Sequence, residues 1–353
     1  MSAFLADFRS DTVTRPTPAM RAAMAAAPVA DDVLDGDPTV GELQVKGAAW
    51  LGKERALFVP SGTMANQIAV GVWTRPGDEV ILESSCHILS YESGALGALH
   101  GVQTRTLDGV RGALDPAAVA RAIRPDFVHS PVTSLVTLEQ THMAAGGRIL
   151  PLAAIEGVAA VCQERGIKLH VDGARLAHAV VATGISARTY CAQVDSVSLC
   201  LSKGLGAPVG SLIAGTDEFI EHALRVRKRL GGWMRQSGIL AAAGLLALDD
   251  GPEGGLSTLP AAHQLAKLVA QRLDAEEGLR SPVDAVDTNL VLCKVDASRF
   301  AGGATALATA LGTHGVGVMA LGPETLRFVT HRDLDPSALV RLDAALTAIL
   351  LRA

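Results

Sequence analysis

The chain has 353 residues, of which 49% are hydrophobic and 19% are charged, and its formal net charge at pH 7 is −5. This composition supplies a substantial core, exceeds one minimal domain and excludes wholesale disorder. The negative charge gives no electrostatic footprint for nucleic acid, so no nucleic-acid partner is expected. The densest basic cluster, Arg225 to Arg229, is expected on a solvated helix face or at a subunit contact.

Cysteine usage and the N-terminus indicate the compartment. The five cysteines are widely spread and have no C-x-x-C or Cys/His ligand spacing, so we expect free thiols in a reducing compartment and no metal site. The N-terminus lacks the basic and apolar regions of a signal peptide, and no apolar run reaches the roughly 18 residues of a membrane span. These features predict a cytoplasmic protein with no membrane contact.

Strand-like and helix-like segments alternate through the centre of the chain, which predicts an α/β fold with a mostly parallel central sheet. Asp115 followed by Pro116 is typical of a helix N-cap and first helical residue. We predict strands over 57–60, 78–83, 102–107, 134–139, 167–171, 194–201 and 209–214, and helices over 63–73 and 152–162.

The pattern changes after Asp249, where a Gly-rich loop over 250–255 begins. The remaining residues suit a small α+β domain. We therefore expect an N-terminal segment and large domain over 1–249 and a small C-terminal domain over 250–353. The small domain is predicted to contain helices over 260–275, 304–311 and 336–351, a strand over 289–295, and short strands near Val316 and Leu326.

An acid and a lysine follow two of the predicted central strands. Asp172 comes directly after the run 167–171, and Lys203 lies among small residues after the run 194–201. The carboxyl ends of parallel strands are where open α/β sheets collect ligand groups. A lysine that forms a Schiff base and an aspartate that keeps a pyridine nitrogen protonated are what pyridoxal phosphate chemistry needs. The pair predicts an enzyme.

Other candidate residues carry weaker signals. Ser61, Gly62 and Thr63 precede a predicted helix, where they suit either a phosphate or ordinary capping. His87 follows the predicted strand 78–83 and could stack on a cofactor ring or act as an acid or base, although lone histidines are more often structural. Arg175 is by itself more often a surface residue than a ligand.

The ordered motifs of the chain resemble those of the low-specificity L-threonine aldolases. That family belongs to the fold type I pyridoxal-phosphate enzymes, which have the aspartate aminotransferase-like fold. The resemblance covers nearly the whole chain. It is carried by the opening Arg9–Pro16, by Ala30–Val33 and Asp37–Thr39, by Ser61–Asn66 and His170–Arg175, by Cys200–Ser211, and by Met234–Gly238 and Leu326–His331.

The resemblance implies a role for each matching residue. It implies that Lys203 forms the Schiff base, that Asp172 partners the pyridine nitrogen and that His87 stacks on the ring. The catalytic residues implied are Lys203, His87 and His129, of which His87 or His129 is the base at the β-hydroxyl, directly or through a water. The cofactor set is Lys203, Asp172, Gly62, Thr63, His87, Arg175 and Arg235, and the substrate carboxylate set is Ser10, Arg175 and Arg327.

The implied activity is retro-aldol cleavage of L-threonine, L-allo-threonine and related β-hydroxy-α-amino acids, such as β-phenylserine, to glycine and an aldehyde. Another fold type I enzyme, such as a β-eliminating lyase or an aminotransferase, is the alternative, but it should lack the opening from Ser10 to Pro16. Relatives are dimers, often paired into tetramers, with active sites shared between chains, so a homodimer or homotetramer is expected.

The chain departs from the family in three segments. Asp31–Gly36 lacks a tyrosine that many relatives carry, Glu139–Met143 replaces a final asparagine with methionine, and Ser130–Ser134 lacks an arginine. The departures leave the cofactor set unchanged. They leave open the preferred β-substituent and the stereochemical preference at Cβ.

Overall fold

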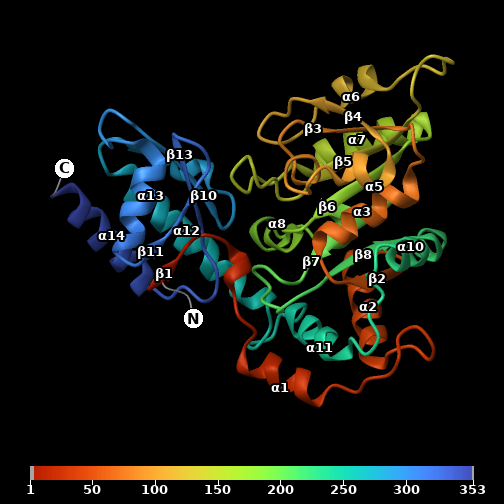
Figure 1. Ribbon diagram of the computed structural model, residues 1–353, viewed down its shortest axis with the longest axis horizontal. Coiled ribbons are helices and arrows are strands. Elements are labelled where there is room, and N and C mark those ends of the chain that lie inside the picture. The colour runs from red at the N-terminus through yellow and green to blue at the C-terminus, as the bar shows by residue number, and fades with distance from the viewer. Residues whose placement is uncertain (1–3, 352–353) are drawn as a thin grey trace.

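The computed structural model describes residues 4–351, which form a large and a small lobe (Figure 1). A seven-stranded sheet with strand order β2-β8-β7-β6-β5-β3-β4 forms the centre of the large lobe. Every neighbouring pair is parallel except the two pairs that involve β8, so β8 alone runs against the others. The strands are β2 (Arg55–Val59), β3 (Glu79–Glu83), β4 (Gln103–Leu107), β5 (Thr133–Glu139), β6 (Lys168–Gly173), β7 (Ser196–Cys200) and β8 (Ser211–Gly215).

Helices cover both faces of this sheet, which is why nearly every residue of its inner strands is buried. Successive residues of a strand point to opposite faces. Leu57 packs in the cluster that contains α3 and α10, whereas Phe58 packs in the cluster that contains α2 and α7. The helices of this lobe are α1 (Pro18–Ala26), α2 (Pro38–Leu51), α3 (Gly62–Trp73), α4 (His87–Ser90), α5 (Ala95–His100), α6 (Pro116–Ala122), α7 (Leu152–Arg165), α8 (Leu176–Thr183), α9 (Ala187–Cys191), α10 (Asp217–Arg229) and α11 (Gly238–Ala247).

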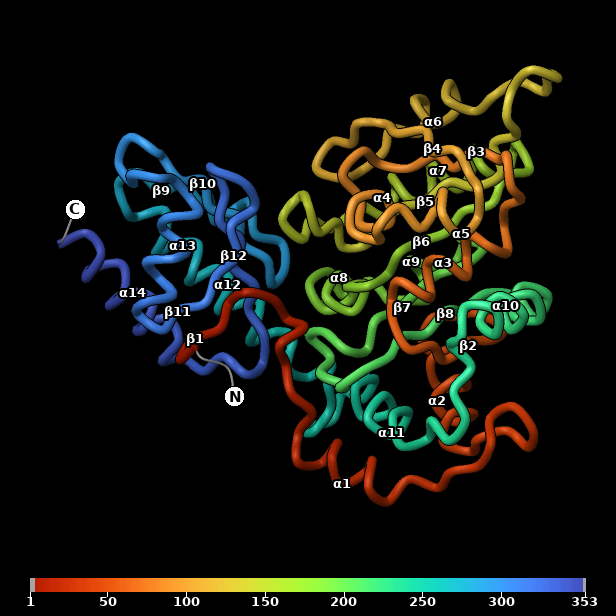
Figure 2. The backbone as a smooth tube through the Cα atoms, in the orientation of Figure 1, coloured from red at the N-terminus to blue at the C-terminus, as the bar shows by residue number. Residues whose placement is uncertain are grey.

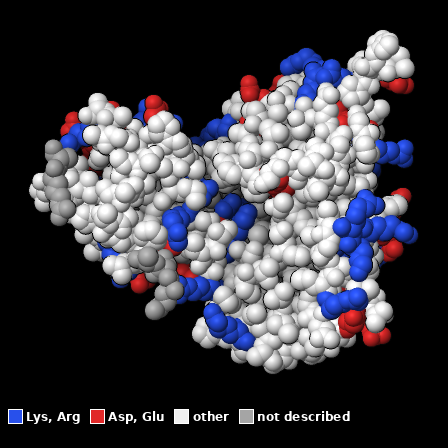
Figure 3. Space-filling model, in the orientation of Figure 1, with Lys and Arg blue, Asp and Glu red and all other residues white. Residues whose placement is uncertain are grey.

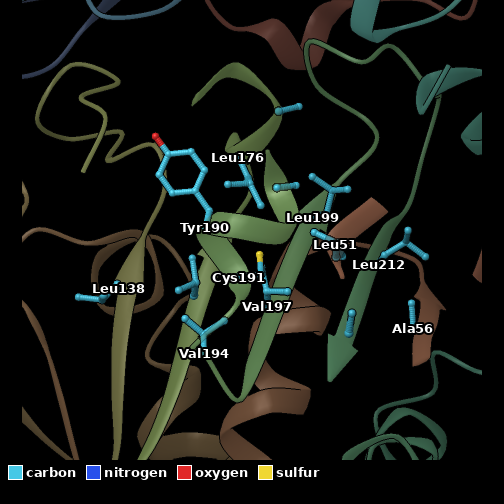
Figure 4. Packing of buried hydrophobic residues seen from close by; sticks show 14 of the residues in the cluster. Leu51, Ala56, Leu138, Leu176, Tyr190, Cys191, Val194, Val197, Leu199 and Leu212 are labelled. Atoms are coloured by element: carbon cyan, nitrogen blue, oxygen red, sulfur yellow. The ribbon is translucent and has the colours of Figure 1, made fainter. Parts of the chain in front are cut away.

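The core of the large lobe is built from aliphatic side chains because aromatic residues make up only 3% of the chain. Figure 4 shows Val197 and Leu199 of β7 beside Leu212 of β8, with Cys191 and Leu51 packed close by. All five cysteines are buried and unpaired. Arg227 corrects the surface interpretation of the basic cluster, because it is 3% exposed and bonds the Phe58 carbonyl and Asp32.

The small lobe holds a four-stranded sheet with strand order β12-β13-β10-β9 and a hydrophobic cluster of its own. The pairs β9–β10, β10–β13 and β12–β13 are antiparallel. Its elements are α12 (Leu259–Asp274), β9 (Leu279–Arg280), β10 (Leu290–Val295), α13 (Gly303–Thr313), β11 (Val316–Gly317), β12 (Met319–Ala320), β13 (Thr325–Val329) and α14 (Ser337–Leu350).

The N-terminal segment begins in the small lobe and then crosses to the large one (Figure 2). Strand β1 (Ala6–Asp7) pairs in parallel with β11, and Phe8 is fully buried in the small-lobe cluster. The expected division places this segment within residues 1–249, and its first strand pairs with a strand of the small lobe. Sequence pattern did not reveal the pairing because it joins residues about 310 positions apart.

No helix among residues 4–351 is long and apolar enough to cross a membrane. The expected α/β architecture with a mostly parallel sheet is confirmed. The central strands β5, β6 and β7 run in the same direction, so their carboxyl ends meet at one edge of the sheet.

Candidate active site

Asp172 and Lys203 lie at the same edge of the sheet. Asp172 is the fifth residue of β6 and pairs in register with Glu139 on one side and Ser198 on the other. Lys203 follows the end of β7 by three residues. The two side chains act on each other through their charges, and Lys203 is among the groups that lower the pKa of Asp172.

Asp172 is buried, and its carboxylate is surrounded by donors. The Asn66 amide donates to Oδ2 at 2.8 Å, and the Ala174 amide donates to Oδ1 at 3.0 Å. Burial raises the pKa of Asp172, but the charges of His87 and Lys203 and the Asn66 hydrogen bond outweigh it, so the pKa is lowered. The group is therefore an ionised carboxylate at neutral pH.

The turn that carries Lys203 is held from both sides. The Thr14 hydroxyl donates to the Lys203 carbonyl at 2.8 Å, and the Gly206 amide donates to the same carbonyl. A Cβ at residue 204 would lie 2.6 Å from Nε2 of His178, so this close approach requires glycine. Lys203 is half-buried, and within residues 4–351 no carboxylate lies within 4.0 Å of its amine.

His87 begins α4, directly beyond the carboxyl end of β3. Its backbone amide donates to Oε2 of Glu139 at 2.8 Å, and its Nδ1 lies 3.0 Å from Oε1 of Glu92. The Tyr91 ring stacks on it, with ring centroids 5.6 Å apart. Burial lowers the pKa of His87, but the Glu92 hydrogen bond and the Asp172 charge outweigh it, so the pKa is raised.

Two buried arginines lie near this edge, and only one of them forms an ion pair within residues 4–351. Arg175 forms a bidentate ion pair with Asp11, with distances of 2.8 Å from Nε and 2.6 Å from Nη2. The Arg327 guanidinium contacts the Met143 and Met319 sulfurs and the Arg9 carbonyl, and its Nε has no partner. Burial and the Arg175 charge lower the pKa of Arg327. Among the described residues Arg327 thus lacks a carboxylate partner, and an incoming carboxylate would supply it.

Ser10 lies in the segment that joins these two arginines. The preceding residue accepts a hydrogen bond from Arg327, and the following residue, Asp11, holds Arg175. The Ser10 hydroxyl caps the short helix Asp11–Val13 by accepting from the Thr12 amide. Asn289, at the start of β10, also donates to Asp11, which ties the segment to the small lobe. Figure 3 shows basic side chains gathered in the hollow between the lobes.

The first turn of α3 offers backbone amides to an anion. Ser61 is its N-cap and accepts from the Met64 amide at 3.1 Å. The amides of Gly62 and Thr63 come earlier in the helix, where no intrahelical acceptor exists. Both residues are at least partly exposed.

Arg235 does not contact this turn within the chain. Its guanidinium pairs with both carboxylate oxygens of Asp31 at 3.2 Å. Gly232, three residues before Arg235, packs so closely on Met64 that a Cβ at this position would clash with the Met64 sulfur. The loop that carries Arg235 therefore passes beside the start of α3.

His129 is not brought to the other site residues of its own chain. It is exposed and packs on Phe127, four residues before β5 begins. Asp172 lies opposite Glu139, the last residue of β5. Six residues of strand separate the two ends by about 20 Å. The direction of β5 therefore places His129 away from the edge that holds Asp172 in the same chain.

Four polar residues of the site were missed from sequence: Asn66, Glu92, Asp11 and Glu139. Each is at most 5% exposed and hydrogen-bonded to a predicted site residue. Asn66 gave the best available signal, since a polar residue on the apolar face of a helix must find a buried partner. The partners of Glu92 and Asp11 lie in distant segments and could not be identified from spacing.

The donors and acceptors of this edge fit pyridoxal phosphate. An unpaired half-buried amine, a buried ionised carboxylate and a helix N-terminus with free amides match its aldehyde, its pyridinium nitrogen and its phosphate. The imidazole of His87 supplies a flat ring. These residues come from four separate segments of the large lobe, and the sheet brings them together.

Comparison with known proteins identifies relatives along nearly the whole chain. The profile of the beta-eliminating lyase family matches residues 7–298. The chain is 45% identical to low-specificity L-threonine aldolase 1 of Arabidopsis thaliana over 336 residues, which cover 94% of this chain and 92% of that protein. It is 40% identical to the low specificity L-threonine aldolase of Escherichia coli strain K12 over 98% of this chain and 99% of the relative.

A solved threonine aldolase from Leishmania major has the same fold. It superposes with a TM-score of 0.80 at 20% identity, over 98% of this chain and 99% of that structure. The agreement in backbone extends through both lobes.

Proposed function

Because the chain belongs to the beta-eliminating lyase family, with low-specificity L-threonine aldolases as its relatives, we propose that it cleaves L-threonine and similar β-hydroxy-α-amino acids. The products are glycine and an aldehyde. The enzyme is a lyase that depends on pyridoxal phosphate.

One observation supports this proposal above the others. An amine without an ion-pair partner and a carboxylate held in its ionised form act on each other at the carboxyl edge of β6 and β7. Arg327, a guanidinium with no carboxylate partner within residues 4–351, lies near the ion pair of Arg175 and Asp11. Together they would bind an amino acid by its carboxylate beside a coenzyme held by Lys203 and Asp172.

Pyridoxal phosphate, when bound, supplies an electron sink for the pair of electrons released when the Cα–Cβ bond breaks. Lys203 would hold its aldehyde carbon, and Asp172 would keep its ring nitrogen protonated. The Gly62 and Thr63 amides would bind its phosphate, and His87 would cover one face of its ring.

The substrate carboxylate would bind at Arg327, with Ser10 and the free Nη1 of Arg175 completing its contacts. Arg175 is the lesser donor, because Asp11 already takes its Nε and Nη2. Fixing the carboxylate in this way orients the bond that is cleaved. Tyr91 stacks on His87, so it would flank the substrate side chain.

Cleavage needs a base to take the β-hydroxyl proton, and Cα must then gain a proton to become glycine. In this chain His87 is the histidine at the site that suits the first step. His129 would act only from a second copy, since its own strand carries it to the opposite edge of the sheet.

We further propose that the protein is a homodimer or homotetramer with shared active sites. Arg235 would then serve the phosphate of a neighbouring site. The exposed apolar residues of the His129 loop suit such a contact, since Phe127 is 55% and Val128 is 88% exposed. The proposed domains are residues 1–249 for the N-terminal segment and large lobe and residues 250–353 for the small lobe, with β1 paired to the small lobe.

The test is an assay of purified protein reconstituted with pyridoxal phosphate. We expect acetaldehyde and glycine from L-threonine, and the rates on L-threonine, L-allo-threonine and β-phenylserine will rank the substrates. Lys203→Ala should abolish cleavage and the visible absorbance of bound coenzyme. Release of 2-oxobutyrate and ammonia from L-threonine in place of acetaldehyde and glycine would refute the proposal and favour a β-eliminating lyase.

A further inference from the structure

Glu92 is a buried carboxylate beside the active site whose role the reaction scheme leaves open. We propose that Glu92 is a positioning residue that holds His87 with the proton on Nδ1, so that Nε2 is the base for the substrate hydroxyl. The inference rests on the proposed function, and it names the group that prepares His87 for that step.

The first support is the set of atoms around Glu92. Its side chain is fully shielded from solvent, and it faces three nitrogen atoms. Oε1 lies 2.9 Å from the Asn66 amide nitrogen and 3.0 Å from Nδ1 of His87, and Oε2 lies 2.6 Å from the Gln67 amide nitrogen. A carboxylate surrounded by donors has no need of a proton of its own.

The orientation of Asn66 makes this assignment firm. Its Oδ1 faces the Ser198 hydroxyl at 3.0 Å, and its Nδ2 faces Oδ2 of Asp172 at 2.8 Å as well as Glu92. Two carboxylates can share that nitrogen only if it is the NH₂ group. Asn66 therefore donates to Glu92 and links it to Asp172.

The tautomer of His87 follows from these contacts. An ionised carboxylate only accepts hydrogen bonds, so the imidazole nitrogen facing Oε1 must be the one that carries hydrogen. In the neutral ring the other nitrogen, Nε2, then has a free lone pair. Within residues 4–351 the ring has no hydrogen bond other than the one to Glu92, and its side chain is 26% exposed, so Nε2 is available to a substrate.

Two further contacts restrict the ring. Its backbone amide is bonded to Glu139, and the Tyr91 ring stacks against it. The hydrogen bond to Glu92 removes the remaining freedom, which is rotation about the Cβ–Cγ bond that would put Cδ2 in the place of Nδ1 and turn Nε2 away from its present direction. Carboxylates that orient a histidine in this way commonly contribute 10- to 100-fold to its activity.

A metal site is the competing interpretation, because one ligand atom from each of His87, Glu92 and Asp172 lies within 4.8 Å of the others. The hydrogens of Asn66 Nδ2 point at both carboxylates and occupy the region between them. A cation there would displace the amide, so the contacts favour an orienting network.

The experiment uses the full chain with ¹⁵N-labelled histidine and reads the tautomer from long-range ¹⁵N–¹H couplings, first without added coenzyme. His87→Asn identifies the His87 signals. We expect wild-type His87 to carry its proton on Nδ1. In Glu92→Gln the signals should report both tautomers, and the His87 pKa should fall.

Activity gives the second measurement. After reconstitution, Glu92→Gln should lower kcat for acetaldehyde release about 10- to 100-fold with little change in KM, and the acidic limb of the pH profile should move with the His87 pKa. Glu92→Asp keeps the charge and should recover part of the loss. Glu156→Gln, at an exposed position of α7, is the matched control and should change neither readout.

Thermal unfolding of each variant separates a positioning role from a folding defect, and Glu92→Asp provides the test if Glu92→Gln is unfolded. Wild-type His87 protonated on Nε2, or an unaltered tautomer and pH profile in folded Glu92→Gln, would overturn the inference. The expected tautomer in a protein that releases no acetaldehyde would instead contradict the proposed function and the base role together, while the Glu92–His87 contact would stand.

Discussion

Arg175 and Arg327 carry the same charge, but their surroundings assign them different tasks. Arg175 is satisfied by Asp11, so its main contribution is to structure. Arg327 is buried against sulfur atoms and a carbonyl, which are weak or uncharged acceptors. A buried cation without an anion is unfavourable, and a substrate carboxylate relieves that cost.

This contrast predicts opposite outcomes for two alanine variants. Arg327→Ala should lower kcat/KM roughly 100-fold or more, mainly through KM, and change the free energy of unfolding little. Arg175→Ala should destabilise the protein by about 3–5 kcal/mol, because it leaves the Asp11 carboxylate buried and unpaired. Steady-state kinetics and urea unfolding of both variants measure the difference. Equal stability losses in the two would show that the pairing is misassigned.

At the scale of elements, N-terminal caps fix the helices that surround the site. Asp37 caps α2 by accepting from the Thr39 and Val40 amides, and its other oxygen accepts from the Gly238 amide at the start of α11. One buried carboxylate thus anchors two helices. Asp115 caps α6 in the usual way but is largely exposed.

We therefore expect Asp37→Ala to cost roughly 3 kcal/mol of unfolding free energy, since it leaves several buried amides without acceptors. Asp115→Ala is the matched control and should cost about 1 kcal/mol, because water can replace its acceptor. Urea denaturation measures both variants. If Asp37→Ala loses no more unfolding free energy than Asp115→Ala, then Asp37 does not anchor both α2 and α11.

The elements also show what sequence can predict. The strand over 134–139 was predicted to within one residue, because it is short and rich in Leu, Val and Thr, as buried strands are. Helix α2 was not predicted as a helix, although Asp37 followed by Pro38 is a start signal that could have identified it. The reversed direction of β8 depends on the loop from Lys203 to Gly210 and is not encoded in the composition of the strand.

The site residues also fall into those that the sequence predicts and those that it does not. Asp172 and Lys203 could be predicted because each follows a buried strand, and strand ends converge whatever the loops do. Asn66 and Glu92 depend on how α3 and α4 pack, and that geometry has no local sequence pattern. The separation of His129 from Asp172 within one chain could not be predicted, because a motif gives a residue's identity without the direction of its strand.

At the scale of the whole molecule, buried histidines set the response to acid. Burial lowers the pKa of His170 to about 4 and of His178 to about 3, and it lowers the pKa of His263 to about 4. The unfolded chain binds protons at these sites below about pH 6.5, whereas the folded chain does not. Stability therefore falls as the pH drops from about 6.5 towards 4. His87 and His142 have raised pKa values and act in the opposite direction.

His178 tests this balance, because it is 2% exposed and its ring bonds His263 at 2.9 Å. The free energy of unfolding of the wild type should fall between pH 7 and pH 5, partly because the unfolded chain takes up a proton at His178. In His178→Asn this fall should be about 2 kcal/mol smaller, since that proton-binding group is removed. Urea unfolding at the two pH values provides the comparison. If wild type and His178→Asn lose the same unfolding free energy between pH 7 and pH 5, His178 is protonated in the folded protein as well.

The path of the first residues has a mechanical consequence. Ala6 is fixed to β11 in one lobe, and Thr14 is fixed to the Lys203 carbonyl in the other. Ser10 lies between these two attachments, in a short segment that connects the two lobes directly. Because Arg327 is bonded to the Arg9 carbonyl, any rotation of the small lobe about a hinge would move Ser10 and Arg327 together. The same movement that closes the lobes would then bring both residues onto the substrate carboxylate.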